Sequence, residues 1–136
     1  RALAPLRPAR AAEARSSLEE SLSVLYGDAE LTHLLARLLA TSADASVRDG
    51  RRALELAQTA AAAQPSGRNA ETVAMALAEL GRFEEAARLQ RQILAAARKA
   101  DSPDQVPIER RLAAYEAGRP VRTPWLDGRS AAPDDG

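Results

Sequence analysis

Residues 70–97 (AETVAMALAELGRFEEAARLQRQILAAA) constrain the fold more than any other part of the chain. Apolar side chains recur there at helical spacing on both sides of Gly81, which interrupts the pattern. Two apolar stripes joined by one tight turn predict a helical hairpin. Ala74 and Ala86 are small enough to let the two helices approach closely.

The rest of the chain continues in the same helical pattern. Alanine is common, aromatic residues make up 3% of the chain and cysteine is absent, so the core must consist of closely packed Ala and Leu side chains. Further apolar stripes, bounded by Gly or Pro, predict helices over residues 10–26, 30–40, 51–64 and 107–117, with a long loop over residues 41–50.

Proline marks both ends of the predicted domain. Residues 1–9 contain two prolines, which lack the backbone N–H of a helix, and this predicts an extended lead-in or linker. Residues 10–117 are expected to form one helical domain. Residues 118–136, with three prolines and several Gly and Asp residues, predict an irregular tail.

An apolar-small-apolar pattern in one predicted helix returns in the helix after next. The two copies are Leu35, Ala36, Leu39 and Val73, Ala74, Leu77. When differences in loop length are allowed for, the underlying period is about 34 residues. The run GRFEEA at residues 81–86 then supplies a specific turn sequence. Together these features resemble the tetratricopeptide repeat (TPR) family.

This resemblance implies an all-α fold of antiparallel helix-turn-helix repeats. The expected architecture is a TPR-like α-solenoid with about two and a half repeats and a C-terminal capping helix. The order of the elements is similar to the C-terminal end of a long bacterial TPR array. The apolar stripes alone leave one alternative open, which is an alanine- and leucine-rich antiparallel bundle without a true repeat.

The chain offers few residues for catalysis. It has one histidine, His33, no cysteine and no G-x-S-x-G motif, and its glycines stand singly at predicted helix ends. His33 shares a predicted helix with Glu30 and Arg37, and their spacing suits a salt-bridged stripe along that helix. One histidine and one carboxylate are too few ligands for a metal site. We therefore predict a non-catalytic protein without a metal or cofactor.

The charge pattern disfavours nucleic acid as a partner. Lys and Arg together number 19, as do Asp and Glu, and the arginines alternate with glutamates without aromatic residues between them. No apolar run reaches the roughly 18 to 20 residues that span a bilayer, so direct membrane insertion is not expected. The Ala- and Arg-rich composition indicates a bacterial source, and the lack of cysteine leaves cytoplasm and periplasm open.

The resemblance also implies where a partner binds. The first helix of each TPR hairpin lines a concave groove that holds peptides or helices. The corresponding positions here are Glu30, His33, Arg37, Thr41, Arg68, Glu71, Met75 and Glu79. The predicted function is a protein-protein interaction scaffold or assembly subunit, whose partner is a peptide, a helix or a neighbouring subunit.

Two further segments are candidates for contacts. The helix over residues 10–26 has no preceding repeat in this sequence to cover it, and its outer face could mediate self-association. Trp125, the only tryptophan, is expected to anchor the tail on the helices or on a partner. Two other functions stay open. One is a structural helical subunit of a larger complex, whether membrane-associated or not, and the other is a small-molecule sensor or enzyme.

Overall fold

The computed structural model describes residues 3–124. Its secondary structure consists of helices joined by turns and loops, without a strand in the described residues. Its helices are α1 (Leu3–Val24), α2 (Ala29–Thr41), α3 (Gly50–Ala63), α4 (Gly67–Glu79), α5 (Phe83–Lys99) and α6 (Gln105–Glu116). The all-helical prediction is therefore confirmed. The long loop after α2 and the helices from α2 onward lie close to their expected boundaries, whereas α1 begins earlier than predicted.

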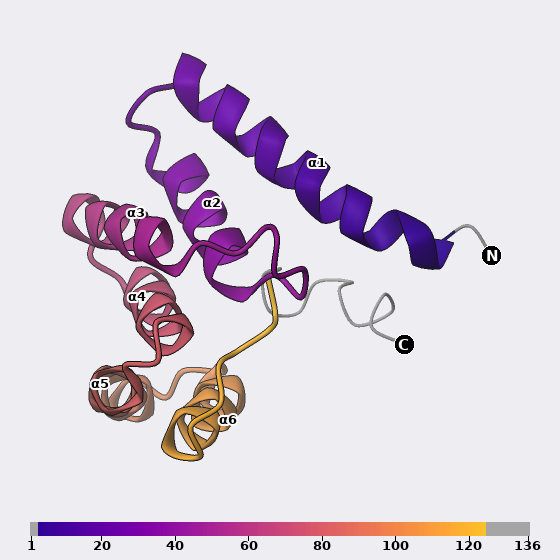
Figure 1. The fold of residues 1–136 in the computed structure, drawn as a ribbon. Helices are drawn as coiled ribbons and strands as arrows, with labels where there is room; N and C mark the ends of the chain where they lie inside the picture. The colour runs from indigo at the N-terminus through magenta and orange to yellow at the C-terminus, as the bar shows by residue number, and fades with distance from the viewer. Residues whose placement is uncertain (1–2, 125–136) are drawn as a thin grey trace.

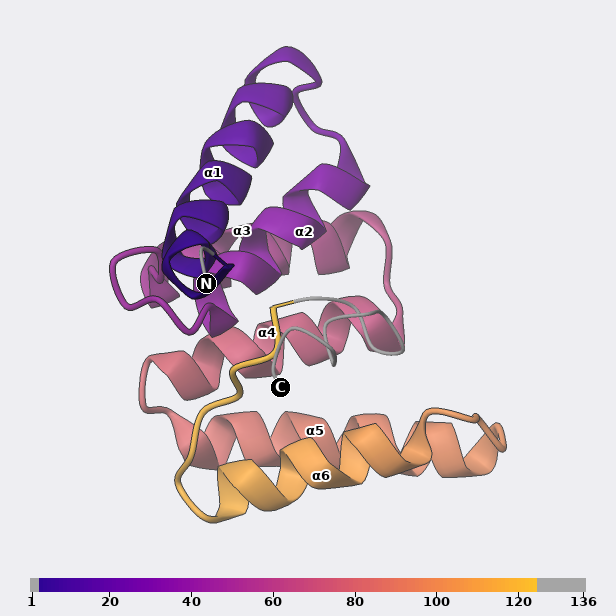
Figure 2. The same ribbon diagram turned by 90° about the vertical axis from the view of Figure 1, so that its right-hand side faces the viewer.

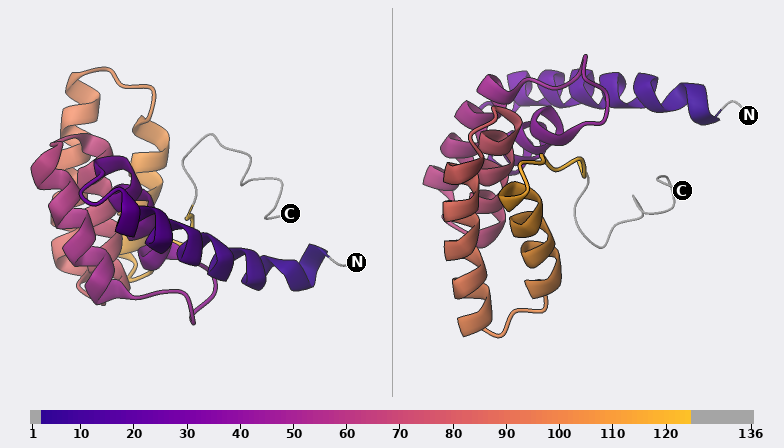
Figure 3. Two further views of the ribbon diagram at one scale, coloured as in Figure 1. Left: turned by 90° about the horizontal axis from the view of Figure 1, so that it is seen from above. Right: turned by 60° about the horizontal axis from the view of Figure 1, so that its bottom comes forward.

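The helices follow one another around an arc, with α1 at one end and α6 at the other (Figure 1). Each helix packs on the next one in the chain, and α2 also packs on α4. Residues 119–124 leave α6 and return along the inner side of the arc toward α2 (Figures 2 and 3). The arc thus has an inner face, along which a segment of the chain itself runs.

Side-chain caps set the starts of three helices. Asp28, Asp49 and Ser66 each accept a hydrogen bond from the backbone N–H three residues later, at 2.9 Å, 3.1 Å and 3.1 Å. These bonds satisfy N–H groups that have no acceptor inside the helix. Short polar residues before each apolar stripe therefore determine where α2, α3 and α4 begin.

The hairpin predicted over residues 70–97 is formed by α4 and α5. Gly81 adopts φ +80°, a left-handed backbone conformation that residues with a Cβ atom rarely adopt. The N–H of Arg82 then donates to the carbonyl of Leu77 at 2.9 Å, which closes the end of α4. The glycine allows the chain to reverse directly into α5.

Several alanines of α2, α3 and α4 lie in the core. Ala36 of α2, Ala53 of α3, and Ala74 and Ala76 of α4 are all completely buried. Leucines fill the space around them, with Leu35 and Leu39 also completely buried. A core with few aromatic residues is possible because small side chains let the backbones approach.

The start of α1 differs from the prediction of an extended lead-in over residues 1–9. The helix begins at Leu3 and includes two prolines. Pro5 falls in the first turn, where the backbone N–H has no acceptor inside the helix, so only Pro8 removes a helical hydrogen bond. Two prolines in nine residues predict a break over the whole stretch, whereas the first turn of a helix accommodates proline at position 5.

The α1–α2 connection and the C-terminal segment are irregular. Val24, Leu25 and Tyr26 are exposed at the end of α1 by 77%, 55% and 93%. Residues 119–124 form no helix, as predicted for the tail. Trp125, the predicted tail anchor, lies outside the described residues. In the part that the structure describes, none of the helices has the length and apolar character needed to cross a bilayer.

Candidate functional site

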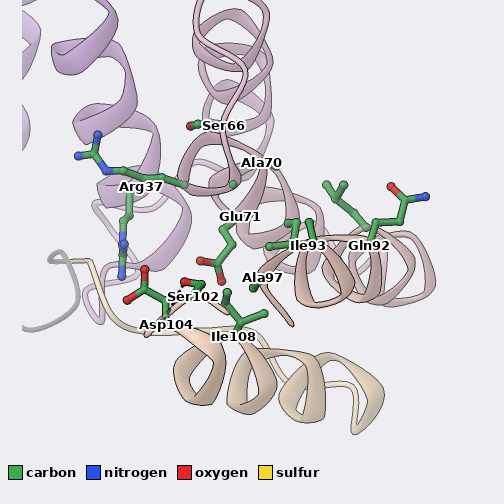
Figure 4. Close-up of a pocket in the computed structure, with 14 residues that line it drawn as sticks. Arg37, Ser66, Ala70, Glu71, Gln92, Ile93, Ala97, Ser102, Asp104 and Ile108 are labelled. Atoms are coloured by element: carbon green, nitrogen blue, oxygen red, sulfur yellow. Dashed lines mark hydrogen bonds between the residues drawn. The ribbon is translucent and has the colours of Figure 1, made fainter. Parts of the chain in front are cut away.

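A pocket of about 780 Å³ opens on the inner face of the arc. Residues from α2, α4, α5, α6 and the loops before α4 and α6 surround it (Figure 4). Its lining consists of Arg37, Ser66, Gly67, Arg68, Ala70, Glu71, Leu89, Gln92, Ile93, Ala96, Ala97, Ser102, Asp104 and Ile108. Three of the predicted groove residues are therefore brought together with residues that are far away in the sequence.

The pocket combines an aliphatic floor with charges of both signs. Ile93 and Ile108 contribute branched apolar side chains from α5 and α6. The carboxylates of Glu71 and Asp104 are turned toward the same space, with the Ser102 hydroxyl beside them (Figure 4). Such a surface can hold an aliphatic side chain and orient polar groups at its rim.

Glu71 connects three helices. Its Oε2 accepts a hydrogen bond from Arg111 Nη1 of α6 at 2.6 Å and another from Gln90 Nε2 of α5 at 2.8 Å. Gln90 Nε2 also donates to the Ile108 carbonyl at 3.1 Å. The Arg111 and Glu71 side chains are only 7% and 12% exposed, so this ion pair is largely shielded from water. The wall of the pocket is held in place by these bonds.

Arg68 stands at the open edge of the pocket. It forms a bidentate pair with Glu30 of α2, with both N–O distances at 2.9 Å. These hydrogen bonds lower the pKa of Glu30. Both side chains are about half exposed, at 41% and 55%, so the pair adds little stability and positions the Arg68 guanidinium at the rim.

Arg37 and Glu79 contact the returning C-terminal segment. Arg37 is 4% exposed, and its Nε donates to the carbonyl of Thr123 at 2.9 Å. Glu79 pairs with Arg48 at 3.0 Å and with Arg122 at 2.9 Å. Two of the predicted groove residues therefore hold a segment of their own chain.

Three predicted groove residues do not face an open surface. His33 and Met75 are each 1% exposed and Thr41 is completely buried. The expectation of an exposed stripe along α2 and α4 is wrong at these positions, because α2 and α4 pack directly on each other. Thr41 instead bonds within α2, where its hydroxyl donates to the Arg37 carbonyl at 2.8 Å.

His33 belongs to a buried polar cluster between α2 and α4. Its Nδ1 lies 3.4 Å from the Thr72 hydroxyl, and Asn69 lies nearby. Burial lowers the pKa of His33 to about 4, and the positive charges of Arg68 and Arg37 contribute, while Glu30 and the nearby Asn69 amide oppose the shift. The imidazole is therefore neutral at pH 7 and serves the contact between the helices.

Sequence reasoning missed Gln90, Asp104 and Arg111. A signal exists for two of them, because Gln90 and Arg111 interrupt apolar stripes at positions that the helical period predicts to be buried. Buried polar residues require a partner, and Glu71 is the one that both share. Asp104 has no such signal, because the chain fold alone brings it to the pocket.

Metal binding and similarity to known proteins give no further indication of function. No cluster of three or more His, Asp or Glu side chains is placed there to hold a metal ion. Comparison of the chain with protein-family models, curated proteins and solved structures gives no match. Any assignment of function therefore depends on the geometry of the inner face.

Proposed function

We propose that the chain is a non-catalytic protein-protein interaction module that binds a peptide or helix of a partner in the pocket on its inner face. The observation that carries the proposal is the pocket of about 780 Å³, which successive helices build around an aliphatic floor. Its size suits one or two anchoring side chains of a protein ligand.

The charged groups at the rim of the pocket favour a polypeptide ligand over a purely apolar ligand. Asp104 offers an exposed carboxylate and Arg68 a half-exposed guanidinium, while the Glu71 carboxylate is already bonded to Arg111 and Gln90. A peptide presents N–H groups, carbonyls and charged side chains around an apolar anchor, and these match a rim of mixed sign.

The proposal includes a TPR-like arrangement, in which α2, α4 and α6 are the first helices of successive units. The period of about 34 residues supports it, as does the packing of α2 on α4 across the intervening α3. In this arrangement the first helices face the inner side and contribute Arg37, Glu71 and Ile108 to the pocket. Scaffolds built in this way present their ligand sites along the concave face.

Two tryptophan substitutions on α5 test the proposal. Ala96 is exposed and lines the pocket, whereas its neighbour Ala95 is exposed and does not line it. We expect Ala96→Trp to fill the pocket and abolish binding of peptides selected from a displayed random library on the wild-type chain. Ala95→Trp carries the same cost in helix propensity and should leave binding unchanged.

The measurement is the affinity of each selected peptide for the three proteins, with helicity by circular dichroism as a check on folding. A library that yields no binder, or binders that Ala96→Trp and Ala95→Trp affect equally, would contradict a binding role for this pocket.

A further inference from the structure

The chain after α6 makes a sharp turn and then runs extended over the inner face. Gly118 adopts φ +72°, and the N–H of Arg119 donates to the Ala114 carbonyl at 2.8 Å, which closes the helix end. Residues 119–124 then pass α4 and reach α2 (Figure 2). We call residues 119–124 the return segment.

The return segment makes three kinds of contact that an extended peptide ligand would make. Val121 is 9% exposed and belongs to an apolar cluster with Ala74 and Ala78 of α4. Arg122 pairs with Glu79 at 2.9 Å. The Thr123 carbonyl accepts a hydrogen bond from Arg37 at 2.9 Å.

The surface under the return segment is supported from elsewhere in the fold. Glu79 is also held by Arg48, at 3.0 Å, and Arg48 Nη1 donates to the Ser42 carbonyl at 2.7 Å. Ala74 and Ala78 belong to α4, which packs on both neighbouring helices. Glu79 and α4 therefore have contacts that do not involve the return segment, and the segment itself has no secondary structure of its own to lose.

We propose that the surface formed by Arg37, Ala74, Ala78 and Glu79 is a docking site for an extended partner segment that carries an aliphatic residue followed by arginine, and that the return segment fills it until the partner displaces it. The commitment to this partner chemistry follows from the segment seated there, in which Val121 and Arg122 supply that pair. The inference deepens the proposed function, because Arg37 also lines the adjoining pocket.

A synthetic peptide of residues 119–124 (RPVRTP), labelled with a fluorescent dye, tests this with the full-length chain. In the double variant Val121→Ser, Arg122→Ser the return segment loses its apolar and ionic contacts while the receptor surface is unchanged. In the wild-type chain the return segment competes with the peptide for the same surface. The apparent affinity of the peptide is then its intrinsic affinity multiplied by the fraction of chains whose surface is unoccupied. We expect the peptide to bind the double variant at least about tenfold more tightly than the wild-type chain.

Changes in the peptide keep the test independent of protein folding. On the double variant, the peptides RPSRTP and RPVQTP should each bind about tenfold more weakly than RPVRTP, since each lacks one contact. Arg119→Ser changes an exposed residue at the start of the return segment and should behave as the wild-type chain.

Equal affinity of the peptide for wild type and double variant, or equal affinity of the three peptides, would overturn the inference. Dimers of the double variant in light scattering without peptide binding would assign the surface to exchange between copies and overturn it as well. Binding of library peptides that Ala96→Trp abolishes reports on the pocket alone, so a failure of this inference is distinguishable from a failure of the proposed function.

Discussion

Arg111 of α6 donates to Glu71 of α4 at 2.6 Å, and both side chains are nearly shielded from solvent. Gln90 of α5 donates to the same carboxylate oxygen at 2.8 Å. One carboxylate thus joins three helices at the edge of the pocket. A buried ion pair of this kind adds little net stability over apolar residues, but removal of one partner leaves a charge without compensation.

We expect Arg111→Ala to lower the free energy of unfolding by about 3 kcal/mol. The exposed pair between Arg91 of α5 and Glu116 of α6 also joins two helices and provides the matched control, since its side chains are 56% and 48% exposed. Arg91→Ala should cost less than about 1 kcal/mol. Urea denaturation of both variants checks this, and similar costs for the two would contradict the structural role of the Glu71 pair.

The unfolding free energy should decrease as the pH falls from about 6.5 to about 4 because of His33. The folded state keeps the imidazole neutral down to about pH 4, while the unfolded chain binds a proton near its ordinary pKa of 6.5. Above about pH 6.5 His33 has no effect on stability. Between about pH 6.5 and about pH 4 the unfolded state binds a proton that the folded state does not, and the fold loses up to about 1.4 kcal/mol per pH unit.

The measurement is urea denaturation at several pH values between about 7 and 5, a range in which carboxyl groups contribute little. His33 is the only histidine of the chain, so His33→Gln should remove this pH dependence. A wild-type stability that is constant over the range would show that His33 titrates normally in the folded state.

We expect Gly81→Ala to destabilise the fold by about 1 kcal/mol or more, since alanine at φ +80° is strained. Gly67 begins α4, has no positive φ, and a Cβ there would meet no atom within 4 Å. Gly67→Ala should therefore be neutral or slightly stabilising. Thermal melts of the two variants compare the same chemical change at two backbone conformations, and equal shifts would contradict the turn geometry.

We expect Val121→Ala to lower the unfolding free energy by about 1 kcal/mol. Val121 is 9% exposed, whereas Val106 in the first turn of α6 is 55% exposed. Val106→Ala should have almost no effect. If both changes were equally mild in chemical denaturation, the segment after α6 would not be packed on the helices in solution.

The candidate site was only partly predictable. The resemblance to the TPR family implied groove positions for Arg37, Arg68 and Glu71, and these three residues line the pocket. The same resemblance implied groove positions for His33 and Met75, which the structure buries. A sequence pattern with helical spacing identifies the residues on one face of a helix. It carries no information on how closely the next helix packs on that face.

The sequence by itself determined the all-helical fold, the loop after α2 and the turn at Gly81, because helix formation, capping and left-handed turns depend on residues within a few positions of each other. Only the tertiary structure decided that Glu71 meets Arg111 and that residues 119–124 return to Arg37. Those contacts join residues dozens of positions apart, and their formation depends on the packing angles of several helices at once.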